Sequence, residues 1–377
     1  MAIPRDAQGP LEVPPELWTV PGIRRESSLE AAADREAPLH YFFTPVAKAR
    51  FLKGLLPVLW FRIPSLALRL WRGRRSASVR PAGTKFPGSP AELTAALKAE
   101  AARLGLRAGV AKYDPLYVFS EFRGYYRFAT VVPLIHEQRH AETNTLPSWR
   151  AENEAMAAYA RLARRGFKLA RWLRRRGYRV QFHDPMLGDA IYQRFAVEAG
   201  LGQMGGNGQL LSPDFGSRLR LMLLTTDAPL LPDGPVDYGI PGLCAKCQVC
   251  IQRCPARALG REVVEYRGVW KYKTATERCF PLVLNYKGCA VCMKVCPVQK
   301  FGLRPVLEHY KRTGEILGKG GADLEFYELP GKGAFGPGEL PAWRPEEFRV
   351  KGWHGPPTKP VAAHRVPKGS GNGPGGR

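Results

Sequence analysis

All eight cysteines of the 377-residue chain lie between residues 244 and 297, and their spacing restricts what this region can become. The cysteines follow the order Cys244-x2-Cys247-x2-Cys250-x3-Cys254-Pro255, then an outlying Cys279, then Cys289-x2-Cys292-x3-Cys296-Pro297. Thiolates two residues apart on a tight loop can each hold one iron of a cubane cluster, and a proline suits a helix start, where no amide donor is needed. The pattern is that of a two-cluster ferredoxin with one ligand displaced.

In such pairs the last cysteine of each run ligates the cluster of the other run. We therefore expect a first cysteine group that holds one [4Fe-4S] cluster, consisting of Cys244, Cys247, Cys250 and Cys296. A second cysteine group is expected to hold the other cluster, consisting of Cys254, Cys279, Cys289 and Cys292. In the second group Cys279 replaces the missing first member of the run, from the far side of a loop of nine residues.

Structural zinc and disulfides are the alternatives for so many cysteines. Zinc sites usually combine two separated Cys-x2-Cys pairs, often with histidine, but the chain has no histidine between His183 and His309. Disulfides need an exported protein. The N-terminus stays polar, and charged residues follow Arg24-Arg25 where a twin-arginine signal has an apolar segment. We therefore predict iron-sulfur clusters in a cytoplasmic protein.

The chain is strongly basic, with a formal net charge of +24 and a pI near 10.0. An acidic partner, an anionic membrane surface, nucleic acid or the anionic groups of a cofactor would each suit this excess, and charge alone does not choose among them. Hydrophobic residues make up 45% of the chain, which is enough for a core in one large domain or two smaller ones.

Residues 1–40 are rich in proline and charge and are expected to form an arm on the surface, and residues 46–75 contain an apolar stretch. A membrane-spanning helix needs about 20 apolar residues with few charges. Lys53, Arg62 and Arg69 interrupt this stretch, and two prolines fall inside it, so a spanning helix is not expected. Two interpretations remain open: a pair of short helices that cover the core, and a basic segment in peripheral contact with a membrane.

The middle of the chain alternates helical and strand patterns. Ser89, Pro90 and Glu92 form a capping box that begins a helix ending near Leu104. The strongest helical periodicity runs from about residue 150 to residue 176, with Gly177 as its stop. Further expected elements are a helix at 190–199 and strands at 106–111, 127–135, 178–182, 209–212 and 218–225. This alternation predicts a layered α/β fold with mixed α+β character and a smaller appended cysteine module.

Five glycines lie between Gly200 and Gly208. Gly200-x-Gly202-x-x-Gly205 has the spacing of a dinucleotide-binding loop, but it follows a helix and precedes a strand, which is the reverse of the required context. A nicotinamide site is therefore not expected. Such a density of glycine lets a backbone approach a large flat ligand closely, and a set of plain turns is the alternative.

The stretch from Glu198 to Asp227 joins this glycine loop to an Asn-Gly pair and to the segments Leu-Leu-Ser-Pro-Asp-Phe-Gly-Ser-Arg-Leu-Arg-Leu and Thr-Thr-Asp. Followed by the cysteine run, it resembles the cobalamin-dependent reductive dehalogenases and their relatives, the epoxyqueuosine reductases of tRNA modification. The resemblance covers residues 100–315. It implies a nitroreductase-like domain that binds a base-off corrinoid, with an appended bacterial-ferredoxin-like two-cluster module. The chain has no Asp-x-His-x-x-Gly motif, the usual source of a histidine ligand to cobalt.

The resemblance also implies roles for single residues. In the dehalogenases a tyrosine protonates the carbon that loses halide, beside a basic residue; the matching positions are Tyr159 and Arg220. An adjacent cation would lower the pKa of the tyrosine. The alternatives are a core-facing aromatic for Tyr159 and a salt-bridged or solvated residue for Arg220. The positions expected to contact the corrinoid are Gly200, Gly202, Gly205, Asn207 and Ser212.

The sequence departs from the dehalogenase pattern in two places. Gly206 stands where the dehalogenases usually carry arginine, and Leu187-Gly188-Asp189 replaces a Gly-Asn-Asp type of turn. These differences leave the substrate open. If Tyr159 is not the proton donor, Tyr125, Tyr126 and Tyr192 are the other candidate tyrosines. His183, Asp184 and Asp189 either form a structural turn or act as acids and bases.

The expected organisation is an N-terminal arm and basic segment (1–80), a corrinoid-binding domain (81–240), the two-cluster module (241–330) and a disordered Pro/Gly/Lys-rich tail (331–377). The resemblance predicts an oxidoreductase that takes electrons from a soluble low-potential donor of the ferredoxin or flavodoxin type and reduces a small molecule. The alternatives are a tRNA-modifying reductase and a non-catalytic electron carrier that uses the clusters alone. The sequence shows no nucleic-acid-binding pattern of arginines and aromatic residues that would support the tRNA-modifying reductase.

Overall fold

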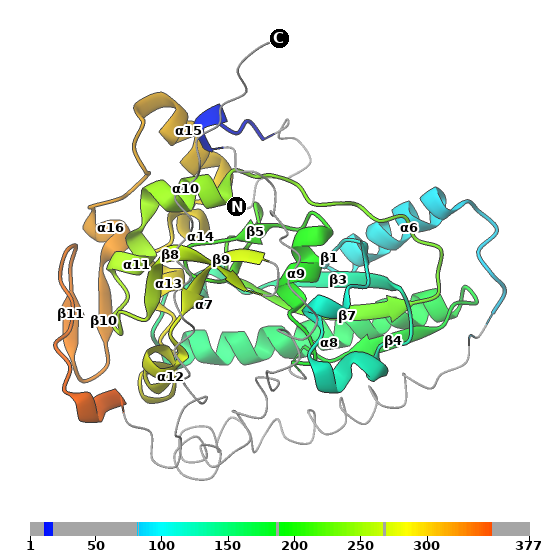
Figure 1. The fold of residues 1–377 in the computed structure, drawn as a ribbon, viewed down its shortest axis with the longest axis horizontal. Helices are drawn as coiled ribbons and strands as arrows, with labels where there is room; N and C mark the ends of the chain where they lie inside the picture. The colour runs from blue at the N-terminus through cyan, green and yellow to red at the C-terminus, as the bar shows by residue number, and fades with distance from the viewer. Residues whose placement is uncertain (1–10, 18–80, 82, 186–187, 267–268, 349–377) are drawn as a thin grey trace.

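The computed structural model of the protein describes residues 11–17, 81, 83–185, 188–266 and 269–348 (Figure 1). A five-stranded sheet lies at the centre of the fold, with the strand order β1-β3-β7-β4 and with β2 also paired to β3. Every pair in this sheet is antiparallel. The strands are β1 (Arg107–Ala108), β2 (Ala111–Lys112), β3 (Thr130–Glu137), β4 (Val180–His183) and β7 (Leu219–Thr226).

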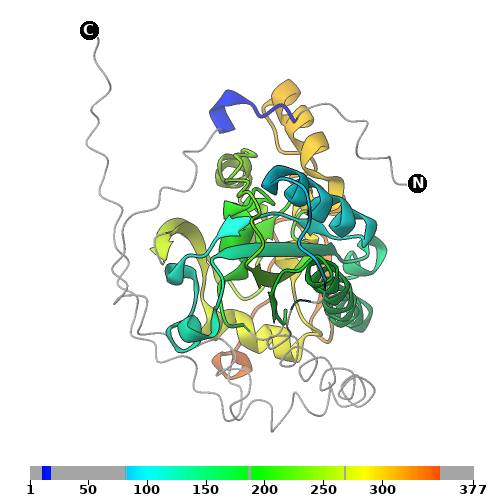
Figure 2. The same ribbon diagram turned by 90° about the vertical axis from the view of Figure 1, so that its right-hand side faces the viewer.

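Helices cover both faces of the sheet because side chains alternate along the strands. Leu134 of β3 and Met222 of β7 pack against α8 (Trp149–Arg174) and α6 (Pro90–Arg103), which lie over one face (Figure 2). Ile135 and Leu223 point the other way, toward α9 (Tyr192–Glu198). The predicted layered arrangement of helices and strands is confirmed.

Local signals explain where these helices begin and end. The Ser89 hydroxyl accepts a hydrogen bond from the Glu92 amide (3.3 Å), and the Glu92 carboxylate accepts one from the Ser89 amide (2.7 Å), so the predicted capping box forms. Ser148 caps α8 by accepting from the Ala151 amide (3.1 Å), and Gly177 (φ +76°) follows the end of the helix. The helix predicted from periodicity is therefore present within two residues at each end.

The strand predicted at 106–111 is split into β1 and β2. Gly109 lies at the break, where a Cβ atom would come within 2.6 Å of the Ala199 carbonyl oxygen. The strand predicted at 127–135 begins three residues later and continues to Glu137, because all eight residues of β3 pair with β7, from Thr130↔Thr226 to Glu137↔Leu219. Sheet partners therefore set these boundaries.

The cysteine-rich part is built from short helices and one hairpin around a separate apolar core that also contains Leu17 from the N-terminal helix η2 (Pro15–Leu17). Its helices are α10 (Ile240–Cys247), α11 (Val249–Gln252), α12 (Thr276–Asn285), α13 (Val291–Lys294), α14 (Pro297–Phe301), α15 (Leu303–Thr313) and α16 (Ala322–Glu325). The hairpin consists of β8 (Leu259–Tyr266) and β9 (Val269–Thr274). The N-terminal end of α8 reaches this part, since Ala151 packs with Met293 (Figure 1).

Residues 331–348, which composition alone places in a disordered tail, instead pack on the cysteine-rich part. Strands β10 (Tyr327–Leu329) and β11 (Gly333–Phe335) form a hairpin, and η5 (Pro345–Phe348) follows. The Trp343 indole donates to the Pro255 carbonyl oxygen (2.7 Å), and the buried Arg253 donates to the Phe335 carbonyl oxygen (3.2 Å). These hydrogen bonds and the β10–β11 hairpin hold residues 331–348 in an ordered arrangement despite their Pro/Gly-rich composition.

The remaining short elements are η3 (Pro115–Tyr117), η4 (Ser120–Tyr125), α7 (His140–Thr143), β5 (Gln203–Met204) and β6 (Leu210–Leu211). Among the described residues, no helix has both the length and the apolar character needed to cross a bilayer. The basic apolar segment at 46–75, most of the predicted N-terminal arm and residues 349–377 lie outside the described part of the chain.

Candidate cluster and cofactor site

The structure brings the first cysteine group together around one small cavity. Its four members line this cavity with Gly206 and Asn207 of the glycine loop: Cys244, Cys247, Cys250 and Cys296. Cys296 occupies the N-cap of α14 and Pro297 the first helical position, as the Cys-Pro pattern predicts. Cys254-Pro255 does not begin a helix; the chain turns there, with Arg257 at φ +49°, and enters β8.

The second cysteine group also converges. Burial, together with the smaller effect of the neighbouring Cys254, raises the pKa of Cys279 to about 11. Burial likewise raises the pKa of Cys289 to about 12, with Cys279 and Cys254 close enough to contribute. The pKa of Cys292 is raised by burial and then by Cys254, Cys289 and Cys279. Four thiols from three segments are therefore neighbours, in the grouping expected from the crossed arrangement; their role as cluster ligands remains a prediction.

Cys279 lies on a helix and not across a loop. Helix α12 carries Cys279 in its first half, and the turn with Gly288 (φ +78°), Cys289 (φ +40°) and Ala290 (φ +54°) returns the chain to α13. Most of the nine residues between Cys279 and Cys289 are helical, which corrects the loop expected from sequence. A rigid element therefore places the displaced cysteine.

Backbone amides meet the sulfurs of both groups. Burial raises the pKa values of Cys247, Cys289 and Cys296, and the amides of Val249, Val291 and Gln299 respectively donate to these thiols and oppose that rise. The Ala258 amide donates to Cys254 Sγ (3.3 Å). Amide donors stabilise thiolate charge, so these surroundings fit cluster ligands.

The two groups adjoin one another. Cys296 of the first group raises the pKa of Cys292 in the second, and Cys292 in turn raises the pKa of Cys250 in the first, each after the larger effect of burial. Within the described residues no three His, Cys, Asp or Glu side chains converge on a single ion. A cubane instead binds each thiolate at a separate iron, so its ligands stand farther apart. The arrangement suits two adjacent clusters better than one mononuclear metal.

The glycine loop contacts the first cysteine group through Gly206. Its amide donates to the Cys244 thiol, and a Cβ atom at residue 206 would lie 3.6 Å from Cys250 Sγ and 3.9 Å from Cys244 Sγ. The departure from the dehalogenase pattern, glycine where arginine is usual, therefore falls directly beside the cysteines.

The other loop glycines serve the loop's own fold. A Cβ atom at Gly202 would lie 2.2 Å from the Leu211 carbonyl oxygen, and one at Gly205 would lie 2.6 Å from the Leu211 side chain. Gly200 (φ +66°) packs against the Gly234 carbonyl oxygen and Val236. Close packing of the chain on itself accounts for these glycines without a ligand, as the turn interpretation expects.

Among the buried polar atoms without a hydrogen-bond partner in the described part of the chain are one in the glycine loop and two at or just before the start of β7: Asn207 Nδ2, Ser217 Oγ and Arg220 Nε. Buried donors normally find an acceptor. Ser212 differs, because its hydroxyl accepts from the Asp214 amide (3.3 Å) and closes a turn. The three unsatisfied groups fit a bound molecule rich in acceptors, and the amide side chains of a corrinoid would supply them.

Tyr159 and Arg220 are in contact. Tyr159 is half-buried on α8, and the guanidinium of Arg220 from β7 lies over its ring, with the Cζ atom 4.8 Å from the ring centroid. Arg220 Nη1 also donates to the Leu219 carbonyl oxygen (3.1 Å). No carboxylate forms an ion pair with Arg220 among the described residues, so the salt-bridged alternative for this residue has no support there.

The reserve tyrosines lie in a closed polar network centred on His183. His183 Nδ1 is 2.7 Å from Asp189 Oδ2, its Nε2 is 3.1 Å from Thr225 Oγ1, and both His183 and Asp189 are fully buried. Tyr192 donates to Asp189 Oδ1 (2.5 Å), and the Tyr126 ring stacks on His183 at 4.2 Å.

Burial raises the pKa of Tyr126 and of Tyr192 well above 10, and the Asp189 charge raises both further. The Tyr125 ring meets His183 edge-on, and Asp184 contributes its carbonyl oxygen as an acceptor for Tyr192. The full burial of His183 and Asp189 favours a structural role for the turn that follows β4, and their contacts with the reserve tyrosines make those tyrosines weaker candidates for a proton donor than Tyr159.

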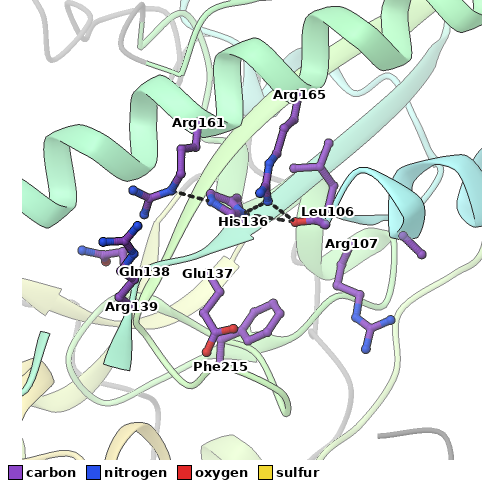
Figure 3. Close-up of a pocket in the computed structure, with 11 residues that line it drawn as sticks. Leu106, Arg107, His136, Glu137, Gln138, Arg139, Arg161, Arg165 and Phe215 are labelled. Atoms are coloured by element: carbon purple, nitrogen blue, oxygen red, sulfur yellow. Dashed lines mark hydrogen bonds between the residues drawn. The ribbon is translucent and has the colours of Figure 1, made fainter. Parts of the chain in front are cut away.

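Sequence reasoning did not single out a basic cavity beside α8, which includes His136, Arg139, Arg161 and Arg165 (Figure 3). Arg161 and Arg165 lie one helical turn apart on α8, which was the available signal. His136 lies on β3 and Arg139 lies two residues after its end, and only the folded arrangement brings them next to α8.

Comparison with known proteins finds relatives for part of the chain. No family model matches the chain. Tetrachloroethene reductive dehalogenase from Sulfurospirillum multivorans is 31% identical over 165 residues, which cover 41% of this chain and 32% of the relative. Epoxyqueuosine reductase from a Synechococcus species is 42% identical over 108 residues, covering 27% of this chain and 33% of the relative. The chain thus spans about a third of the length of these curated relatives.

A solved structure of a catabolic reductive dehalogenase superposes with a TM-score of 0.57 at 24% identity, over 64% of this chain and 38% of that chain. At 24% identity, this similarity supports a shared fold only. The resemblance inferred from the glycine loop and the cysteines is confirmed: over the segment that they share, the chain is similar to reductive dehalogenases and to epoxyqueuosine reductases, which are oxidoreductases.

Proposed function

We propose that the protein is a corrinoid- and iron-sulfur-dependent reductase of the reductive dehalogenase type, with an organohalide or a similar small molecule as substrate. The observation that carries this proposal is the contact between the glycine loop and the first cysteine group, through the Gly206 amide and Cys244. A cluster on that group would lie directly beside a cofactor bound at the loop. A cluster on the second group, which adjoins the first, would pass on electrons from a soluble low-potential donor.

The chain's own groups would hold both kinds of cofactor. The eight cysteines would ligate two [4Fe-4S] clusters, with backbone amides donating to their sulfurs. Asn207, Ser217 and Arg220 each carry an unsatisfied buried donor that a corrinoid amide could accept. When bound, the clusters supply single electrons and the corrinoid supplies a strongly nucleophilic low-valent cobalt.

Tyr159 would hold the proton that the reaction needs. Net reduction of a carbon-halogen bond consumes two electrons and one proton, forms a carbon-hydrogen bond and releases halide. The Tyr159 hydroxyl would give its proton to that carbon, and Arg220, already over the ring, would stabilise the phenolate left behind. Protonation from solvent would then restore the tyrosine.

A tRNA-modifying reductase is the second candidate. The net charge of +24 and the 42% identity to an epoxyqueuosine reductase favour it. This candidate needs the same two clusters and the same corrinoid, so only the substrate separates it from the first.

Anaerobic reconstitution followed by substrate assays tests the proposal. About eight irons per chain together with tightly held base-off cobalamin are expected, followed by halide release from an organohalide panel with a strongly reducing donor. Iron without retained cobalamin would reject both candidates and favour a cluster-only electron carrier. No halide release, with tRNA binding that persists at raised salt, would favour the second candidate, because nonspecific attraction to phosphate is screened by salt.

A further inference from the structure

A cavity of about 520 Å³ opens between the C-terminal end of α6, the end of β3 and one edge of α8 (Figure 3). Four arginines line the cavity, namely Arg107, Arg139, Arg161 and Arg165. Glu137 is the one carboxylate among its lining residues. The volume falls within the range of small-molecule sites. Neither the cysteines nor the glycine loop contribute to this cavity.

Strand alternation separates the charges of the cavity. His136 and Gln138 point to the face of β3 that α8 covers, whereas Glu137 points to the opposite face. Figure 3 shows Glu137 beside Phe215, away from Arg161, His136 and Arg165. The α8 side of the cavity is therefore cationic, and the carboxylate lies apart from it.

His136, as a neutral ring, accepts a hydrogen bond from Arg161 and shares the Gly105 carbonyl oxygen with Arg165. Arg161 Nε donates to His136 Nε2 (3.2 Å), so the proton of the neutral ring lies on Nδ1, which donates to the Gly105 carbonyl oxygen (3.1 Å). Arg165 Nη1 donates to the same carbonyl oxygen (3.0 Å). Burial, together with the smaller effect of the Arg165 charge, lowers the pKa of His136 to about 4.

Three carboxylates balance only part of the positive charge. Arg107 pairs with Asp214 (3.0 Å), Arg161 pairs with Glu154, and Glu137 pairs with Arg218. Arg139 and Arg165 have no carboxylate within ion-pair distance in the described part of the chain. Two positive charges therefore remain at one cavity.

Gln138 supplies an independent sign of a ligand. Its side chain is 2% exposed and lines the cavity, and its amide oxygen has no hydrogen-bond partner among the described residues. The oxygen and nitrogen of a glutamine side chain are assigned from their hydrogen-bond partners, and a rotation of the Gln138 amide by 180° would bring its NH₂ group to the position of the oxygen. In that orientation the NH₂ group would donate to an oxyanion bound beside the arginines.

We propose that this cavity binds a dianionic oxyanion, phosphate or a phosphate ester, through Arg139, Arg165 and Arg161, with the Gln138 amide as a further donor. Two unpaired guanidinium groups match the two charges of a phosphate group, and arginine presents paired N–H donors to its oxygens. The site is separate from the cysteines and the glycine loop, so the inference stands whether or not the proposed reductase activity is found.

Calorimetric titration of the full-length, cluster-loaded protein at pH 7.5 and constant ionic strength tests the proposal. Inorganic phosphate and glycerol phosphate are the probes for the free ion and the ester, and acetate is the monoanionic comparison. Arg139→Gln and Arg165→Gln are each expected to weaken phosphate binding about tenfold. Arg164→Gln removes an equal charge from an exposed neighbouring position on α8 and is expected to leave the affinity unchanged.

A second variant makes the test independent of folding defects. Glu137→Gln removes the carboxylate that lines the cavity and is expected to tighten phosphate binding several-fold. Tighter binding of the ester than of the free ion would identify an esterified ligand, and the reverse order a free one. Absence of phosphate binding in the wild-type protein, equal binding of acetate, or equal losses in Arg139→Gln and Arg164→Gln would each overturn the proposal.

Discussion

Arg220 from β7 places its guanidinium over the ring of Tyr159 from α8, 4.8 Å from the ring centroid. Sequence resemblance selected these two residues separately, 61 positions apart, and the packing of α8 on β7 brings them together. A cation over an aromatic ring contributes about 0.5–2 kcal/mol and restricts the ring's orientation. The contact of the Tyr159 ring with Arg220 can therefore be separated from the proposed proton donation by its hydroxyl, and a single substitution distinguishes the two.

Replacing Tyr159 with phenylalanine keeps the ring under Arg220 and removes only the hydroxyl. We expect Tyr159→Phe to retain iron and corrinoid at wild-type levels while halide release falls about 100-fold or more, because a positioned proton donor contributes at least that factor. Tyr126→Phe is the matched control, since its hydroxyl lies in the closed network around His183. Normal turnover in Tyr159→Phe would show that another group donates the proton.

The crossed arrangement of the cysteines leads to a test by iron content. Cys279→Ala should damage the cluster of the second group and leave about four irons per chain in the first. The double variant Cys279→Ala/Cys254→Ala should retain the same four irons, because both residues belong to one group. The double variant Cys279→Ala/Cys296→Ala should lose both clusters.

A sequential arrangement, in which each run holds its own cluster, predicts the opposite for the two double variants. In that case Cys279→Ala/Cys296→Ala would keep about four irons and Cys279→Ala/Cys254→Ala would lose both clusters. Iron and sulfide analysis of the anaerobically reconstituted proteins, with electron paramagnetic resonance of the reduced state, distinguishes the two outcomes.

Local signals predicted much of the fold. The Ser89 capping box and the periodicity of α8 depend on neighbours along the chain, and both are present. Predictions failed where distant contacts decide: Gly109 splits a strand because Ala199 packs against it, and Trp343 holds an apparent tail against Pro255. Sequence periodicity carries no information about such partners.

The candidate site divides in the same way. Cysteine spacing anticipated which thiols become neighbours, since the spacing itself reflects the geometry of the cluster. The loop glycines were less informative, because tight self-packing at Gly202 and contact with the cysteines at Gly206 produce the same residue type in the sequence. The basic cavity could not be foreseen, because His136 meets Arg161 only through the packing of β3 on α8.

Two glycine substitutions separate these roles within the loop. At Gly202 an added Cβ atom would lie 2.2 Å from the Leu211 carbonyl oxygen, so Gly202→Ala must shift the backbone and is expected to lower the free energy of unfolding by about 2–4 kcal/mol. At Gly206 the nearest atoms are at 3.5 Å or more, so Gly206→Ala should change stability by less than about 1 kcal/mol. Urea unfolding of both variants measures the difference, and equal effects would contradict the assignment of Gly202 to the loop's own packing.

His136 gives the protein a pH-dependent stability. Its pKa is about 4 in the folded chain, because of burial and the Arg165 charge, against about 6.5 when unfolded. Between these values the unfolded chain binds the extra proton, so stability is complete above pH 6.5 and is lost as the pH falls. From pH 7.5 to pH 5 the loss due to this residue is about 2 kcal/mol.

His136→Gln keeps an acceptor for Arg161 but cannot titrate. Urea unfolding of the wild-type protein and of this variant at both pH values, with iron content checked at each, should show a pH-dependent loss that is smaller by about 2 kcal/mol in the variant. At pH 7.5, where the wild-type ring is neutral, any difference between the two proteins reflects packing alone and serves as the reference. Identical losses on acidification would show that His136 is already accessible to protons in the folded chain, and that the neutral ring between Arg161 and Arg165 is not maintained.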